Sequence, residues 1–115
     1  MSQWKCRGWW EQEGYGRQLM QSLQLRFQGQ QLEGSGVDVV GAFTLTGVCE
    51  NGRVVFNKQY VQKHAVTYHG HYDGEGTFSG DWQLEWEQGK WLIKMERQRD
   101  ASRPLEIVDF EPNGG

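Results

Sequence analysis

The sequence predicts an all-β fold, an antiparallel up-and-down β-barrel of about eight strands with a C-terminal tail. Three observations carry this prediction. Apolar and polar residues alternate with a period of two along most of the chain, which is typical of strands with one buried face. Glycine is frequent, with 16 residues, whereas proline occurs only twice. The hairpins are regular and no long crossover separates them, so the meander is expected to close on itself and remove both sheet edges.

The alternation predicts strands at residues 3–11, 18–28, 31–36, 42–50, 53–61, 64–73, 77–87 and 90–98. The inward face of the first strand carries Trp4, Cys6, Gly8 and Trp10, and that of the second carries Leu19, Leu23, Leu25 and Phe27. Residues 1–98 then form a single barrel domain, and 99–115 form the tail. Apolar residues in the tail are candidates for packing back onto the barrel: Leu105, Ile107 and Phe110.

Three hairpin turns set the register of the second half. Asn51-Gly52 is a strong two-residue hairpin signal, and it places Phe43 opposite Tyr60 inside the barrel. For 73–76, a type I turn that starts at Asp73 and ends in a left-handed bulge at Gly76 keeps the apolar residues on one face. The third turn is predicted at Gln88-Gly89, which sets Trp86 opposite Trp91, both inward.

Composition excludes several classes of protein. The net charge is −3 and no run of Lys or Arg stands out, which argues against a nucleic-acid partner. No apolar stretch is long enough to span a membrane, and the first residues lack the apolar core of a signal peptide. Cys6 and Cys49 fall on inward positions and are interpreted as buried reduced thiols. A cytoplasmic protein is therefore expected.

Several motifs resemble known proteins. A Trp on the first strand that can pack against an Arg on the last resembles the calycin group of small barrels, which includes lipocalin-like and avidin-like proteins. The matching pair here is Trp4 with Arg97, which the resemblance places at a closed end. A second set is similar to small uncharacterised bacterial proteins and brings no known activity: 34–38, Val54, Phe56, Lys58, Tyr60, His64, Tyr68 and 80–82.

The other end of the barrel is rich in aromatic residues. Parity gathers an inward set there: Trp10, Phe43, Tyr60, His64, Trp86 and Trp91, with Lys58 one inward step deeper. Rings supply contact area and polar tips supply orientation, so this set predicts a pocket for a small apolar or aromatic ligand. The alternative is that the same rings fill the interior, because an eight-stranded barrel is barely wide enough for more than its own side chains.

Two inward polar residues need an explanation. A buried Lys is costly unless it is paired or neutral, so Lys58 indicates a charged ligand, an internal partner such as Asp38, or an error of register near the rim. His64 is more often a hydrogen-bonded core histidine than a catalytic base.

Catalytic, metal and cofactor signals are weak. On the outer face His69, His71 and Asp81 offer two nitrogens and one oxygen to Zn²⁺, but no fourth ligand accompanies them, and coincidence on a polar face explains them better. Ser35 between two glycines lacks the strand-to-helix context of a nucleophile elbow. No buried acid–base pair and no cofactor motif is evident, so neither an enzyme nor a cofactor is predicted.

Two functions from different classes follow. The first is a binding module that holds a small, partly apolar ligand at the aromatic end. The second is a structural or interaction protein with a filled barrel, a monomer or a homodimer, because apolar residues also alternate outward. Those outward residues are Trp9, Val40, Val48, Val55 and Val61.

Overall fold

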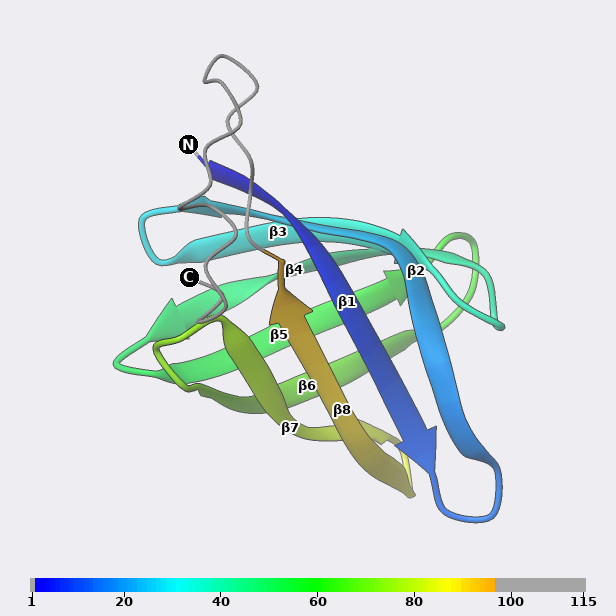
Figure 1. Cartoon of the computed structure of the whole chain (residues 1–115). Coiled ribbons are helices and arrows are strands. Elements are labelled where there is room, and N and C mark those ends of the chain that lie inside the picture. The colour runs from blue at the N-terminus through cyan, green and yellow to red at the C-terminus, as the bar shows by residue number, and fades with distance from the viewer. Residues whose placement is uncertain (1, 97–115) are drawn as a thin grey trace, which may run out of the picture.

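The computed structural model describes residues 2–96, which form eight antiparallel strands closed into one barrel (Figure 1). The strands are β1 (Ser2–Gln12), β2 (Gly16–Gln28), β3 (Gln31–Val37), β4 (Ala42–Glu50), β5 (Arg53–Tyr60), β6 (Ala65–Tyr72), β7 (Thr77–Leu84) and β8 (Glu87–Met95). Each strand pairs with its neighbours in sequence, and β1 also pairs with β8, which closes the sheet. The predicted fold class is confirmed. The predicted tail at 99–115 lies outside the described residues.

Period-two alternation builds the core. In β5 every second residue is buried, with Val54, Phe56, Lys58 and Tyr60 inside and the residues between them exposed. The interior between the two ends is filled by side chains with no exposed area, among them Leu25, Leu45, Val54, Phe56, Phe78 and Ile93. Their burial is the main favourable term in the stability of the barrel.

Two predicted hairpins form with the expected register. Across the Asn51-Gly52 turn, Glu50 pairs with Arg53 and Phe43 with Tyr60. In the β6–β7 turn the Asp73 Oδ1 accepts hydrogen bonds from the amides of Glu75 (2.7 Å) and Thr77 (3.0 Å). Gly76 has a φ of 104°, in the left-handed region that the predicted bulge requires. The predicted type I turn is wrong, because Gly74, its first central residue, has a φ of 82° where that turn requires about −60°. The register of β6 on β7 then follows, with Tyr68 opposite Trp82 and Gly70 opposite Gly80.

The register of β7 on β8 differs from the prediction. The turn lies at Glu85-Trp86, not at Gln88-Gly89, and Glu85 takes a φ of 56°. Gly89 sits inside the strand opposite Trp82, where a Cβ would clash with the Glu11 carbonyl of β1 and lie 2.5 Å from the Trp82 Nε1. This glycine therefore makes room for an indole ring instead of turning the chain.

The start of β2 also departs from the predicted pattern. The pairing of β1 with β2 shifts between Cys6 and Gly8, and Ser22 has a φ of 52°. This bulge reverses the facing of the residues before it. Met20 is consequently buried, whereas Leu19, predicted inward, is 63% exposed.

The end of the barrel at which β1 begins and β8 finishes was expected to be closed by Trp4 and Arg97. Trp4 packs partly against the core, and Arg97 lies outside the described residues, so their pairing stays a prediction.

Cys6 is a buried free thiol and Cys49 a half-buried one. The cytoplasmic location inferred from them stays a prediction as well. Within residues 2–96 the structure contains no helix long and apolar enough to cross a membrane.

Candidate functional site

A carboxylate from a loop is buried inside the barrel. Asp38 follows β3 and closes a tight turn with Gly41, in which each backbone amide donates to the other residue's carbonyl at 3.0 Å. The turn directs the Asp38 side chain inward, where it has no exposed area. Its Oδ1 accepts a hydrogen bond from the Val40 amide at 2.9 Å. The loop thereby delivers a negative charge to the barrel interior.

Three side chains from two strands converge on the other oxygen of this carboxylate. The Asp38 Oδ2 accepts hydrogen bonds from Lys58 Nζ (2.7 Å), the Tyr60 hydroxyl (2.7 Å) and Trp10 Nε1 (3.0 Å). A buried carboxylate is tolerated when its lone pairs are satisfied in this way. We call Asp38, Lys58, Tyr60, Trp10 and Tyr68 the polar network.

Lys58 is the cation of this network. Its side chain is 1% exposed, and its Nζ donates to Asp38, to the Tyr68 hydroxyl at 3.0 Å and to the Met20 sulfur at 3.7 Å. Of the three explanations for an inward Lys58, the structure shows an internal partner, Asp38. All three ammonium hydrogens have acceptors, so the buried charge needs no further partner.

Burial and pairing shift the pKa values of these groups. Burial lowers the pKa of Lys58 to about 8, although Asp38 acts in the opposite direction. Burial alone would raise the pKa of Asp38, but hydrogen bonds from Lys58 and Tyr60 and the Lys58 charge hold it below its usual value. Burial raises the pKa of Tyr60 and Tyr68 well above the ordinary tyrosine range, so both keep their protons.

A cavity of about 180 Å³ opens at the barrel mouth above the polar network. Its walls are four aromatic rings and three aliphatic side chains, and its rim is polar. The walls are Trp10, Tyr60, Tyr68, Trp82, Val40, Val66 and Leu84, and the rim is Gln12, His64 and Glu87. We call this space the mouth cavity. Trp10 and Trp82 meet edge to face with ring centroids 5.8 Å apart, which fixes one wall.

Five of the seven predicted ligand-binding residues lie in or below the mouth cavity. Trp10, Tyr60 and His64 line it. Phe43 and Lys58 lie in the core beneath, where the Phe43 ring packs edge-on against Tyr60 at 5.8 Å. His64, predicted inward, is exposed because it lies in the β5–β6 loop and not on a strand; its ring rests 5.1 Å from that of Tyr60.

The two remaining tryptophans lie elsewhere. Trp86, predicted inward, is 87% exposed, because the β7–β8 turn falls on it. Trp91 is inward but sits in the core opposite Gly80, and not opposite Trp86. Its ring stacks on Tyr68 at 5.0 Å, and its Nε1 donates to the carbonyls of Asp81 (3.0 Å) and His69 (3.2 Å). Neither tryptophan lines the mouth cavity.

Several lining residues were not among the predicted site residues. Tyr68, Val66, Trp82 and Leu84 all carried the signal of inward parity on β6 and β7. The misplaced turn at Gln88-Gly89 extended β7 by three residues and moved its aromatic end to Trp86. With the turn at Glu85-Trp86, the mouth of β7 is formed by Trp82 and Leu84.

The candidate zinc site on the outer face is not formed. His69 lies opposite Asp81 and His71 opposite Ser79, as predicted. However, the Asp81 carboxylate forms an ion pair with Lys90 at 2.7 Å. Among the described residues, no three His, Cys, Asp or Glu side chains are grouped so as to hold a metal ion.

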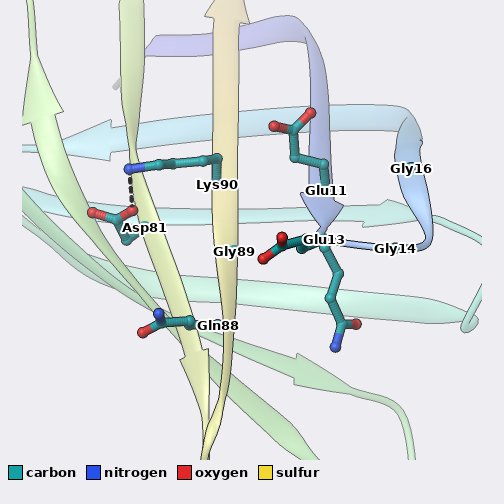
Figure 2. A pocket seen from close by; sticks show the side chains of 9 residues that line it. Glu11, Glu13, Gly14, Gly16, Asp81, Gln88, Gly89 and Lys90 are labelled. Carbon is teal, nitrogen blue, oxygen red and sulfur yellow. Dashed lines mark ion pairs between the residues drawn. The ribbon is translucent and has the colours of Figure 1, made fainter.

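A larger hollow of about 670 Å³ lies on the outer surface, across β8 near the β1–β2 loop (Figure 2). Figure 2 shows Lys90 reaching from β8 to Asp81, with Glu11 and Glu13 on the other side of the strand. Most of the charges here are paired with neighbours, Lys90 with Asp81 and Glu11 with Arg17 at 3.3 Å. Exposed pairs of this kind are typical of a solvated face. The mouth cavity, which gathers buried polar groups, is the better candidate site.

No protein-family model, no curated protein and no solved structure matches this chain. The described residues form a small closed barrel of eight antiparallel strands.

Proposed function

We propose that this protein is a binding module for a small, partly apolar ligand held in the mouth cavity. The observation that carries the proposal is the mouth cavity itself: about 180 Å³ of space walled by aromatic rings. An apolar cavity of about 150 Å³ is large enough to take a benzene ring. The ligand is accordingly the size of a single ring, smaller than the ligands of most pockets.

The polar network supports this proposal because it gives the cavity a rigid floor. Asp38 fixes Trp10 and Tyr60 by hydrogen bonds, and both rings line the cavity. A wall held by directional bonds does not collapse into empty space as loosely packed side chains do. Such preorganisation lowers the entropic cost of binding.

The test is a titration with ethylbenzene and acetophenone, followed by NMR at the indole N–H signals of Trp10 and Trp82. We expect saturable 1:1 binding with a Kd on the order of 0.1 mM, as ligand efficiencies for so few atoms allow. Val66→Phe fills the cavity from its wall and is expected to abolish binding. Val48→Phe on the outer face of β4, where Val48 is 46% exposed, is the matched control and leaves binding unchanged. Absence of saturable shifts with both probes would refute the proposal.

The second candidate is an interaction protein that forms a homodimer through an outer strand face. Val48 and Val55 are cross-strand partners on β4 and β5, exposed by 46% and 43%. Val61 is also exposed, but two other predicted members are not free. Val40 packs against the core, and Arg17 lies over the Trp9 ring at 3.8 Å. Sedimentation as a monomer at all concentrations would exclude this candidate.

A further inference from the structure

The four aromatic walls of the mouth cavity carry four hydrogen-bond donors, and three of them are engaged. Trp10 Nε1 and the Tyr60 hydroxyl donate to Asp38. Trp82 Nε1 donates to the Glu11 carbonyl at 3.0 Å. An indole N–H has one hydrogen to donate, as has a phenol. A ligand therefore finds no donor at these three rings.

The fourth donor, the Tyr68 hydroxyl, is free. Its oxygen accepts from Lys58 Nζ at 3.0 Å, but its own hydrogen has no acceptor among the described residues. Tyr68 lines the cavity, is 1% exposed and keeps its proton because burial raises its pKa. A buried donor without an acceptor costs free energy, which a ligand that supplies the acceptor recovers.

The charges around the cavity argue against a cationic ligand. Lys58 Nζ lies 4.3 Å from the ring centroid of Phe43, 4.9 Å from that of Tyr60 and 5.1 Å from that of Tyr68. The chain's own ammonium thus already lies within 5.6 Å of three of the four rings that line the cavity, those of Trp10, Tyr60 and Tyr68. A second cation beside it would be repelled, and the buried carboxylate, Asp38, is already engaged, which leaves the exposed, solvated carboxylate of Glu87 at the rim.

An anionic ligand is also expected to bind weakly. Lys58, the buried cation below the cavity, is neutralised by Asp38 at 2.7 Å. Glu87 at the rim adds a negative charge at the entrance. A carboxylate that entered would lose its hydration without gaining a partner, which is unfavourable.

We infer that the ligand of the mouth cavity is an uncharged single-ring molecule with a carbonyl-type acceptor, and that the Tyr68 hydroxyl donates to this acceptor. The inference rests on the proposed function and names the chemical class of its ligand. It also assigns Tyr68 as the residue that determines specificity.

Four probes of similar shape test the inference on the unmodified protein: acetophenone, ethylbenzene, benzoate and benzylammonium. One hydrogen bond predicts that acetophenone binds about three- to tenfold more tightly than ethylbenzene, which lacks the acceptor. Benzoate and benzylammonium are expected to bind more weakly than either. Equal affinity for acetophenone and ethylbenzene, or a preference for a charged probe, overturns the inference and leaves the proposed function standing. Absence of binding by all four probes refutes both.

Tyr68→Phe then tests the assigned residue. We expect acetophenone to lose its three- to tenfold advantage, so that the ratio of its affinity to that of ethylbenzene falls to about one. Tyr72→Phe is the matched control, since Tyr72 lies on the same strand at the opposite end of the barrel and packs on Phe78 at 4.5 Å. An acetophenone preference that survives Tyr68→Phe in a folded variant contradicts the assignment. The comparison of probes on the unmodified protein remains decisive if the variant does not fold.

Discussion

The two ends of this barrel are filled in different ways. At the end near the β4–β5 and β6–β7 turns, aromatic rings pack on one another. The Phe78 ring centroid lies 4.5 Å from that of Tyr72 and 6.2 Å from those of Phe27 and Phe56. We call this the apolar end. At the opposite end, which holds the polar network and the mouth cavity, a carboxylate and an ammonium lie inside the barrel with hydrogen-bonding partners around them. We call this the network end.

The difference shows how one alternating pattern produces both a core and a cavity. Apolar side chains at the apolar end adjust to one another until the space is filled, as in ordinary protein interiors. At the network end, Asp38 accepts four hydrogen bonds and fixes the groups around it. Directional bonds hold Trp10 and Tyr60 in place, so space remains above them.

The largest expected effect comes from removing the centre of the polar network. Asp38→Ala leaves the Lys58 amine buried without its carboxylate, so it either stays charged and unpaired or gives up its proton. The free energy of unfolding is expected to fall by about 3–5 kcal/mol. Urea denaturation followed by circular dichroism measures it. Lys58→Met is expected to cost less, because Asp38 keeps three donors, those of Trp10, Tyr60 and Val40.

Asp81→Ala is the matched control for the loss of a carboxylate. It breaks the exposed ion pair with Lys90, whose side chain is 65% exposed, and should change stability by less than about 1 kcal/mol. Equal losses for Asp38→Ala and Asp81→Ala would show that the polar network contributes nothing beyond a surface pair. The two ends would then not differ in the way described.

The pH dependence of stability gives a smaller effect. The pKa of Lys58 is lowered in the folded protein to about 8, from an ordinary value near 10.5. Between these values the unfolded Lys58 binds more protons than the folded one, so stability rises with pH from about 8 to 9, by about 1 kcal/mol. Above about pH 9 the buried Cys6, whose pKa is raised to about 12, keeps a proton that the unfolded thiol loses, which offsets any further rise. Above pH 10 the unfolded tyrosines ionise while Tyr60 and Tyr68 stay protonated, so stability falls again.

The loss of stability at low pH comes from a carboxylate and not from an amine. The pKa of Asp38 is lowered in the folded protein, so its contribution is complete above the unfolded value and is lost as pH falls below about 4. Urea midpoints measured from pH 3 to pH 11 test both limbs. Lys58→Met is expected to remove the rise between pH 8 and 9. A rise that persists in this variant would assign it to another group.

Sequence patterns predicted the barrel well because most of its strands follow strict alternation and its clearest turns have specific residues. The Asn51-Gly52 turn formed as predicted, and the left-handed Gly76 gave the predicted register of β6 on β7, although the turn before it is not of type I. The partnership of Lys58 with Asp38 was also among the predicted alternatives, since a buried ammonium requires an acceptor.

The errors arise where a residue has two possible uses. Gly89 matched a turn glycine, but the structure uses it to admit the Trp82 indole, which depends on contact with β1. The bulge at Ser22 has no marker in the local sequence, and it exchanges the facing of Leu19 and Met20. Such features are decided by packing between distant strands, which periodicity alone does not show.

The smallest effect tests the corrected register of β7 and β8. Trp86 is 87% exposed in the turn, so Trp86→Ala is expected to change the free energy of unfolding by less than about 0.5 kcal/mol. Trp91→Ala, a matched change of a tryptophan that is 1% exposed, is expected to cost about 3–5 kcal/mol. Chemical denaturation of both variants measures the contrast. A loss above about 2 kcal/mol for Trp86→Ala would place this side chain inside the barrel and restore a turn at Gln88-Gly89. The mouth cavity would then have a different wall, because Trp86 and not Trp82 would face it.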